Sequence, residues 1–430
     1  MLAIYSFLYT LTMIVLSPLF VVRRSKYASG FRQRLGNYPT FVHDQRKVIW
    51  LHCVSVGETN AARPLVDQMI KEFAGWRLII STTTRTGHQL AGKIFEGKAD
   101  AVFYFPFDWK FSVRRALRTF RPTMLLLMET EVWPRLIYEA KRSGARVAIV
   151  NGRLSERSLA RYQMASNFIR RILDNVDAAL MQSETDAERI KALGFEPKRV
   201  VVTGNLKFDI SAEHFESELT DLFQRRFRQH GTRPVIVAAS THEPEERILL
   251  ASLQDLLPYH AKLFIAPRHP DRFEAVWDLL NSSSYRVVRR SDPGSENDRS
   301  SDVILLDSIG ELRSLFPIAE IVFVGGSLIP HGGQSILEPA AAGKAIVTGP
   351  YTHNFKEAIT AFVREDALIQ IPQAGDESEF IAGLHEQFSN LLDHEARRRQ
   401  LGANALKVIN DNSGSAVTTV KKLKELAGVE

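Results

Sequence analysis

The sequence predicts an α/β protein built from two doubly wound domains, each with a parallel sheet. Strand-length apolar runs alternate with amphipathic stretches along most of the chain, and this alternation is typical of parallel sheets covered by helices on both faces. It stops once, at residues 210–232, which are polar and charged, and then resumes. The length of 430 residues is also too great for one ordinary core. Two domains are therefore expected, facing each other across a cleft.

The first domain is expected at residues 23–209 and the second at residues 233–430, joined by a linker at 210–232. The strands expected in the first domain are 48–54, 77–82, 101–105, 123–128, 146–150, 178–182 and 199–204. Those expected in the second domain are 234–240, 261–267, 303–307, 320–326 and 344–349. Residues 291–302 (SDPGSENDRSSD) are polar enough to predict a solvated loop, and residues 377–427 are expected to be helical.

Residues 1–22 differ from the rest of the chain. The segment 2–22 has 21 residues and no charge, which is about the length that crosses a bilayer. Residues 23–36 follow with five basic residues and no acidic one, and basic flanks stay on the cytoplasmic side. We therefore expect residues 1–22 to anchor the protein to a membrane, with its body on the cytoplasmic face. Because Pro18 and several polar residues weaken a span, a helix lying in one leaflet is the alternative.

Composition narrows the partners and the compartment. A net charge of +6 and a pI near 9.3 suggest an anionic partner, which is a nucleic acid, a membrane surface or a phosphorylated substrate. Nucleic acid is disfavoured because the basic residues are spread out and no stacking aromatic motif accompanies them. Cys53 is the single cysteine, so an intramolecular disulfide and a cysteine-based zinc site are excluded.

Glu58 is the first candidate functional residue. Ligands of open parallel sheets bind beyond the carboxyl ends of the strands, and in VSVGE both Gly57 and Glu58 follow the first strand of the body. Gly57 is expected to permit a turn that a side chain would block. Glu58 is then expected in the first turn of a helix. An acid there is stabilised by the helix dipole, which is the non-catalytic interpretation. The functional interpretation is a general base, because a glutamate with a pKa of about 4.3 is ionised at neutral pH.

The segment MLLLMETEVWP ends an apolar strand with Glu129 and Glu131. Residues two apart in an extended chain point to one side, and two like charges side by side need cations or ligand hydroxyls nearby. Solvated loop acids are the alternative. Arg153, in NGRLSERS, is a candidate for the matching cation. Lys207, in GNLKFD, lies at the expected domain junction, where a plain surface lysine is the alternative.

The second domain carries glycine-rich turns before helices, at residues 325–326 and 332–333. Such turns present bare N–H groups that hold phosphate. Arg268 can offer paired donors to a phosphate or carboxylate, and Glu338 is placed to accept ribose hydroxyls. No H-E-x-x-H, Walker loop or G-x-G-x-x-G is present, which argues against a zinc protease, a P-loop NTPase and a standard dinucleotide enzyme.

Several segments, taken together and in order, resemble one bacterial family. They are WLHCVSVGE, FPFD, METEVWP, NGRLSERS, QSETD, GNLKFD, APRHPDRF, GEL, FVGGS and LEPAAAGKAIVTGP, with GFRQRLG after the apolar N-terminus. They resemble the 3-deoxy-D-manno-octulosonic acid (Kdo) transferases of lipopolysaccharide synthesis, and the resemblance covers nearly the whole chain. It implies a GT-B glycosyltransferase with two Rossmann-like domains, the first binding the acceptor and the second the CMP-sugar. It also implies transfer of Kdo from CMP-Kdo to the disaccharide lipid A precursor (lipid IVA), at the cytoplasmic face of the inner membrane.

The resemblance also implies roles for residues. Glu58 matches the proposed catalytic base, and Glu129 and Lys207 match positions thought to assist the transition state. The residues that match the CMP-binding part are Pro267, Arg268, Ile309, Gly310, Glu311, Ser335, Ile336, Leu337 and Glu338. We expect a direct displacement with inversion. The sequence demands no metal and no cofactor beyond the donor substrate.

One departure from the family pattern leaves the identity of the donor sugar open. Gln334 and Ser335 stand where the family usually has histidine and asparagine; they still donate hydrogen bonds, with a different reach. A GT-B transferase or epimerase acting on another nucleotide sugar is therefore one alternative. The other is a membrane-anchored nucleotide-binding protein without catalysis, in which Glu58 and Glu129 would be dispensable.

Overall fold

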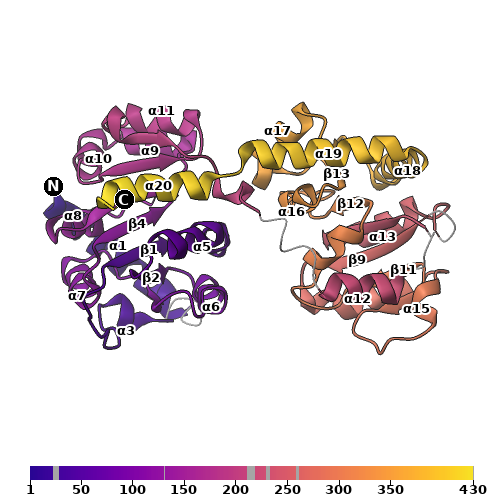
Figure 1. Cartoon of the computed structure of the whole chain (residues 1–430), viewed down its shortest axis with the longest axis horizontal. Helices are drawn as coiled ribbons and strands as arrows, with labels where there is room; N and C mark the ends of the chain where they lie inside the picture. The colour runs from indigo at the N-terminus through magenta and orange to yellow at the C-terminus, as the bar shows by residue number, and fades with distance from the viewer. Residues whose placement is uncertain (23–28, 130, 211–217, 229–232, 258–260, 430) are drawn as a thin grey trace. The chain divides into compact units, whose positions relative to one another are not determined.

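The computed structural model describes residues 1–22, 29–129, 131–210, 218–228, 233–257 and 261–429 (Figure 1). The chain divides into two compact units. The first unit comprises Met1–Asp209 and Asn412–Glu430, and the second comprises Ile210–Asp411. Each unit has one seven-stranded sheet in which all neighbouring strands are parallel. The prediction of two parallel-sheet α/β domains is confirmed.

The sheet of the first unit has the order β3-β2-β1-β4-β5-β6-β7. Its strands are β1 (Val48–Cys53), β2 (Arg77–Thr82), β3 (Ala101–Tyr104), β4 (Met124–Met128), β5 (Arg146–Gly152), β6 (Ala178–Met181) and β7 (Val200–Val202). The direction in which strands are added reverses between β1 and β4. In open parallel sheets the carboxyl edge at such a reversal is where ligands bind.

Helices cover both faces of this sheet. They are α1 (Leu2–Val22), α3 (Phe31–Arg34), α4 (Val56–Ala61), α5 (Arg63–Glu72), α6 (Arg85–Ile94), α7 (Lys110–Phe120), α8 (Pro134–Arg142), α9 (Glu156–Gln163), α10 (Ser166–Leu173), α11 (Glu184–Ala192) and α20 (Ser415–Ala427), with the 3-10 turns η1 (Pro197–Arg199) and η2 (Leu206–Phe208). Trp50 packs on one face of the sheet and Leu51 on the other, and both are fully buried. Two-sided burial explains why the strands read as continuous apolar runs.

The sheet of the second unit has the order β10-β11-β9-β8-β12-β13-β14. Its strands are β8 (Val235–Thr241), β9 (Lys262–Pro267), β10 (Val287–Arg289), β11 (Val303–Leu305), β12 (Ile321–Val324), β13 (Ala345–Thr348) and β14 (Ile369–Gln370). Its helices and 3-10 turns are α12 (Glu218–Phe227), α13 (Glu245–Ser252), η4 (Pro270–Arg272), α14 (Phe273–Asn281), α15 (Asn297–Ser300), η5 (Leu312–Ile318), α16 (Leu337–Ala341), η6 (His353–Phe355), α17 (Lys356–Arg364), α18 (Glu377–Asp393) and α19 (Glu395–Asn412). Here the order reverses between β8 and β12.

The C-terminal segment departs from the predicted domain bounds, because α20 belongs to the first unit (Figure 1). Asp209, the last residue of GNLKFD, accepts hydrogen bonds from the backbone N–H groups of Gly414, Ser415 and Ala416 at the start of α20. The apolar face of α20 joins the same core cluster as Leu65 and Leu206. The second domain therefore ends near residue 411, not at residue 430.

The expected linker also differs. The part of it that forms α12 is a helix of the second unit, and Phe223 and Phe227 are buried there against Phe264. The rest of the expected linker lies outside the described residues, apart from a few positions at its edges.

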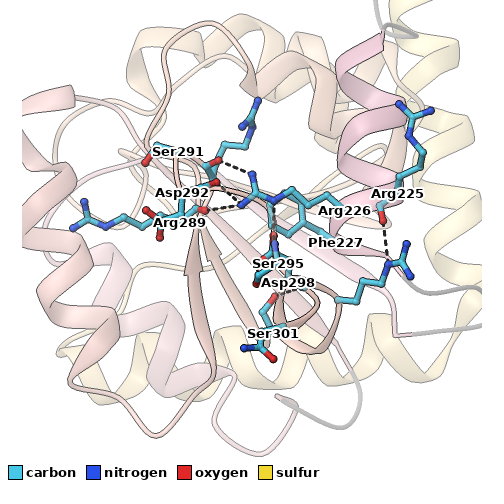
Figure 2. A network of polar contacts seen from close by, with 12 residues as sticks. Arg225, Arg226, Phe227, Arg289, Ser291, Asp292, Ser295, Asp298 and Ser301 are labelled. Atoms are coloured by element: carbon cyan, nitrogen blue, oxygen red, sulfur yellow. Dashed lines mark hydrogen bonds and ion pairs between the residues drawn. The ribbon is translucent and has the colours of Figure 1, made fainter.

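Residues 291–302 were expected to be a solvated loop, and this prediction was wrong for the second half of the segment (Figure 2). Asp298 and Asp302 are each only 2% exposed. The Arg226 side chain on α12 donates to the Asp298 carboxylate at 2.5 Å and to the carbonyl oxygens of Arg290 and Asp292 at 2.9 and 2.7 Å. Arg226 thus joins the segment to α12, and the polar composition of the segment did not indicate this contact.

The N-terminal segment forms the helix α1, as an apolar run without charge favours. Tyr5 donates its hydroxyl to the Asp108 carboxylate at 2.7 Å, and the Trp109 indole N–H donates to Thr10 at 2.9 Å. Arg135 donates to the hydroxyl of Ser6 at 2.8 Å. One side of α1 is thus seated on the first unit. Within the described residues, no helix combines the length and the apolar character that crossing a bilayer requires.

Candidate active site

Two predicted site residues flank the strand-order reversal of the first unit. Glu58 follows β1 in the first turn of α4, and Glu129 directly follows β4. The two strands are neighbours, with His52 paired to Leu127. Because the carboxyl ends of parallel strands meet at one edge of a sheet, the two carboxylates share the edge where ligands of such sheets bind.

The local sequence explains how Glu58 is held. Ser55 is the N-cap of α4, and its hydroxyl oxygen accepts the N–H of Glu58 at 3.4 Å while its O–H donates to Oε1 of Glu58 at 3.1 Å. The backbone N–H of Val54 donates to Oε2 at 2.7 Å. The spacing S-x-x-E is that of a capping box, but here the carboxylate accepts the N–H of Val54, the residue before the N-cap. Gly57 is not needed for a turn, because its φ is not left-handed and a Cβ there would meet only Ser55 Oγ at 3.7 Å.

The environment raises the pKa of Glu58 to about 7. Burial is the main cause, since the residue is 7% exposed, and the negative charges of Glu129 and Glu131 add to it. Hydrogen bonds from Val54 and Ser55 act in the opposite direction but do not cancel these effects. A carboxyl whose pKa lies near neutrality is suited to take a proton and to hold it at working pH. The helix-dipole interpretation and the general-base interpretation are therefore compatible.

Glu129 and Glu131 lie near enough to Glu58 for their charges to raise its pKa, but Glu129 lacks the extended backbone from which both were expected to point to one side. Burial, followed by the charge of Glu129, raises the pKa of Glu131. Glu129 has a left-handed backbone with a φ of 54°, a conformation that non-glycine residues rarely adopt and that concentrates at functional sites. Arg153, the candidate cation, follows β5 and its side chain is exposed.

Lys207 lies in η2, between the buried side chains of Leu206 and Phe208. The Asn205 side chain is the N-cap of this turn and accepts the N–H of Lys207 at 3.0 Å. The side chain of Lys207 is half-buried, and within the described residues its ammonium has no hydrogen bond or ion pair. It is a cation held on a fixed backbone and available to an anionic ligand.

The predicted donor residues of the second unit follow three strands of its sheet, of which β11 and β9 are neighbours and β12 is separated from them by β8. Arg268 follows β9, Ile309–Glu311 follow β11, and Ser335–Glu338 follow β12 at the start of α16. They share the carboxyl edge of the second sheet. The Arg268 backbone N–H donates to the carbonyl of Thr241 at 3.0 Å, and its side chain is exposed. Pro267 is buried at the strand end and fixes the backbone that leads into Arg268.

The segment Ile309–Glu311 is held by side chains outside it. Arg290 pairs with the Glu311 carboxylate at 2.9 Å, and the Ser308 hydroxyl donates to the same carboxylate at 2.7 Å. Gly310 has a φ of 89°, which a side chain would strain, and the side chain of Ile309 is 78% exposed. The Glu311 carboxylate is thus committed to the protein. The groups this segment can offer a ligand are its backbone and the Ile309 side chain.

The segment Ser335–Glu338 contains both buried residues and residues whose side chains can reach a ligand. Ile336 and Leu337 are buried in the core, so they can offer a ligand only backbone groups. Ser335 is exposed and Glu338 is half-buried, with no hydrogen bond from its carboxylate to any described residue. The Glu338 carboxylate is therefore able to accept ligand hydroxyls.

The expectation that Gly325 and Gly326 offer bare N–H groups was wrong. The fully buried Glu245 carboxylate accepts the N–H groups of Gly326, Ser327 and Leu328 at 2.7, 2.9 and 2.9 Å. The Gly325 N–H donates to the carbonyl of Ala239 at 2.8 Å. The side chain of Glu245 thus fills the anion position of this turn. In the sequence, Glu245 stands three residues after His242. This acid after the strand was a signal for a partner of the glycine turn, and it was not used in the prediction.

His242, which the sequence analysis did not select, contacts the variant position of the family pattern. The Gln334 amide lies 3.3 Å from Nε2 of His242, and the His242 ring lies against those of His331 and His269, with centroids 4.3 and 5.4 Å away. Burial, with the charges of the two neighbouring imidazoles, lowers the pKa of His242 to about 4. His242 is therefore neutral at physiological pH. No three histidine, cysteine or carboxylate groups of the described residues are placed to share a metal ion.

Solved structures define the class of this fold. The chain resembles the UDP-GlcNAc 2-epimerase from Neisseria meningitidis bound to UDP-GlcNAc, with a TM-score of 0.60 and 16% identity over 88% of this chain and 100% of that chain. It also resembles a glycosyltransferase from Rickettsia africae, with a TM-score of 0.56 and 12% identity over 89% of this chain and 98% of that chain. The two parallel-sheet units thus resemble GT-B proteins in fold.

Sequence comparisons are more specific. Residues 29–210 match the family model of the 3-deoxy-D-manno-octulosonic-acid transferases (kdotransferases). The chain is 31% identical over 431 residues to the 3-deoxy-D-manno-octulosonic acid transferase of Haemophilus influenzae, covering 98% of each chain. It is 30% identical over 390 residues to that of Bordetella pertussis, covering 88% of this chain and 87% of the relative. The protein belongs to the Kdo transferase family and is a glycosyltransferase.

Proposed function

We propose that the protein transfers Kdo from CMP-Kdo to the lipid A precursor, with inversion at the anomeric carbon and with Glu58 as the general base. The observation that carries this proposal is the pKa of Glu58, raised to about 7 at the sheet edge where ligands of such folds bind. Family membership supports Kdo as the transferred sugar. It also argues against the alternative of a binding protein without catalysis.

In the proposed reaction a hydroxyl of the acceptor attacks the anomeric carbon of Kdo as Glu58 takes the hydroxyl proton. The bond between the anomeric carbon and the phosphate oxygen breaks, and its electron pair leaves with CMP. Positive charge develops on the sugar ring, as in other glycosyl transfers. A base on one face and a leaving group on the other give inversion. Lys207 is free to pair with the sugar carboxylate, and Glu129 to stabilise positive charge on the ring.

The second unit supplies the groups proposed to hold CMP. The exposed Arg268 guanidinium offers paired donors to the departing phosphate. Glu338 accepts the ribose hydroxyls, and the backbone of Ile309–Glu311, fixed by Arg290, contacts the base. Gln334, which stands where the family usually has histidine, lies beside the neutral imidazole of His242. Because these groups serve the leaving phosphate, the proposed reaction uses no metal and no separate cofactor.

The proposed setting is the cytoplasmic face of the inner membrane, reached through α1. Leu2, Tyr5, Ser6, Tyr9 and Thr10 lie on the side of α1 that contacts the first unit. The opposite side exposes large apolar side chains, namely Ile4, Phe7, Leu8, Leu11, Ile14 and Val15. A helix held to its domain on one side and apolar on the other suits an orientation parallel to the bilayer surface. This favours the leaflet alternative over a span.

The test is transfer by the purified full-length protein in detergent. It receives freshly generated CMP-Kdo and tetraacylated lipid A precursor, and the product masses are read. A product heavier by one or more Kdo residues is the expected result. A protein that binds CMP but forms no product with this pair would contradict the proposed donor or acceptor. A screen of other nucleotide sugars then tests the remaining alternative, for which Gln334 and Ser335 are the first residues to revert.

A further inference from the structure

Asn151 has a set of features that the proposed mechanism does not use. It is the last residue but one of β5 and lies next to the end of β4, where the Glu129 N–H donates to the carbonyl of Val150 at 3.0 Å. Asn151 and Glu129 both have left-handed backbones, with φ of 53° and 54°. Two such residues on adjacent strand ends are unusual, because this conformation costs free energy and persists where the surroundings impose it.

The Asn151 side chain contacts the segment that carries Lys207. Oδ1 of Asn151 accepts the backbone N–H of Leu206 at 3.0 Å, while the carbonyl of Asn151 accepts the side-chain amide of Gln182 at 3.0 Å. Asn151 is fully buried, and its amide nitrogen has no hydrogen-bond partner among the described residues. An unmet buried donor is costly. Among the described residues, the Asn151 side chain therefore holds other groups only through Oδ1, which accepts the N–H of Leu206.

We propose that Asn151 is a positioning residue for transfer, which fixes the turn Leu206–Phe208 to the end of β5, beside the end of β4 that Glu129 follows, and so sets where the Lys207 ammonium lies. The inference rests on the proposed function, from which Lys207 takes its role. The argument is geometric. Asn151 holds the N–H before Lys207, Asn205 holds the N–H of Lys207 itself, and the buried side chains on both sides stop the turn from rotating.

The test is Asn151→Gly in the full-length protein. Glycine accepts the left-handed backbone, so this change removes the hold on Leu206 without adding strain. We expect kcat to fall about 10²-fold, the size of loss that a displacement of about 1 Å produces, with the KM for CMP-Kdo unchanged. Asn175→Gly is the matched control. Asn175 lies in the same unit, and its amide bonds only the nearby carbonyls of Arg171 and Ile172.

A double-variant cycle separates positioning from a general structural effect. If Asn151 acts through Lys207, Asn151→Gly combined with Lys207→Met is no slower than Lys207→Met alone. Losses that multiply would overturn the proposal. Hydrogen exchange gives a readout without turnover, since the amides of Leu206 and Lys207 should exchange faster in Asn151→Gly. Asn151→Asp, which keeps the acceptor oxygen and tolerates the backbone, should retain their protection and most of kcat even if the glycine variant folds poorly.

The outcomes also separate this inference from the proposed function. Wild-type protein that transfers Kdo, with a glycine variant of unchanged kcat and unchanged exchange, overturns only the role of Asn151. Wild-type protein that transfers no Kdo overturns the proposed function and removes the catalytic reason for the turn.

Discussion

Ser55 and Glu58 bind each other reciprocally at the start of α4, with the Ser55 hydroxyl donating to the Glu58 carboxylate and accepting the Glu58 backbone N–H. This pairing fixes the carboxylate while burial and two neighbouring acids raise its pKa to about 7. A carboxyl that is both immobile and poised near neutrality meets the two requirements of a general base, position and proton affinity. The predictions begin with this residue.

Glu58→Gln should lower kcat by about 10²–10⁴-fold, the usual contribution of general-base catalysis. A glutamine keeps the capping-box spacing, so the fold and CMP binding should be retained. The measurement is the initial rate of Kdo transfer, with CMP binding by calorimetry. Glu184→Gln is the matched control, because Glu184 is an exposed acid in the first turn of α11 with the same serine cap. A Glu58→Gln protein with near wild-type turnover would remove Glu58 from the mechanism.

Glu58 should also make stability depend on pH. Its folded pKa of about 7 exceeds its reference value of 4.5, so the folded state binds the proton more tightly than the unfolded state. The free energy of unfolding therefore falls as pH rises from about 4.5 to about 7, by up to about 3 kcal/mol. Glu58→Gln should thus raise the Tm at pH 8 relative to wild type and change it little at pH 4.5. Equal Tm shifts at both pH values would contradict the raised pKa.

Glu129→Gln should move the acid limb of the transfer rate to lower pH. The negative charge of Glu129 helps to raise the pKa of Glu58, and its removal lets Glu58 ionise more easily. The measurement is kcat/KM against pH for both proteins at equal ionic strength. An apparent pKa that stays in place or rises would show that the limb belongs to another group.

Arg226→Met should destabilise the second unit strongly. It leaves the buried Asp298 carboxylate without its ion pair and removes the hold on residues 290–298. Breaking a buried pair from one side typically costs about 3–5 kcal/mol. Arg364→Met removes the exposed pair with Glu365, which is expected to cost less than about 1 kcal/mol. Urea unfolding of both variants gives the comparison, and similar losses would argue against the fastening role of Arg226.

Charging the exposed side of α1 should weaken membrane binding. Phe7→Glu and Ile14→Glu place carboxylates on side chains that are 68% and 62% exposed. Each should lower the affinity for vesicles containing anionic lipid by about tenfold or more, because a large apolar side chain contributes about 1.5–3 kcal/mol on burial. Val42→Glu, at an apolar residue that is 74% exposed outside α1, is the control. Vesicle flotation that is unchanged by both α1 variants would place the membrane contact elsewhere.

The fold was largely predictable because both sheets are buried on both faces, so their central strands stand out as apolar runs. The short edge strands β10 and β14 were missed, since they have only three and two residues and partial burial. The placement of α20 was also missed. Nothing in the sequence around Ser415 indicates that its helix is capped by Asp209, which lies 206 residues earlier.

The candidate site likewise has features that the sequence predicted and features that it did not. Strand-end logic located Glu58, Glu129 and the donor segments, because it depends only on where strands stop. It failed at Gly326, where a distant carboxylate takes the backbone amides. It also passed over Asn151, whose proposed role depends on a left-handed backbone and on a hydrogen bond to a residue 55 positions away. A local sequence pattern cannot predict which polar groups form hydrogen bonds with residues far away in the chain.

The docking of α20 has a consequence for synthesis on the ribosome. The first unit needs residues 412–430 to cover the core around Leu206, yet these residues are translated only after the whole of the second unit. The second unit is continuous in the chain and can close as soon as it emerges. The part of the enzyme made first therefore completes its fold last. Until then, the apolar surface that α20 covers is open to chaperones and to proteases, and a ribosome that stalls before residue 412 leaves a protein whose Glu58 unit is unfinished.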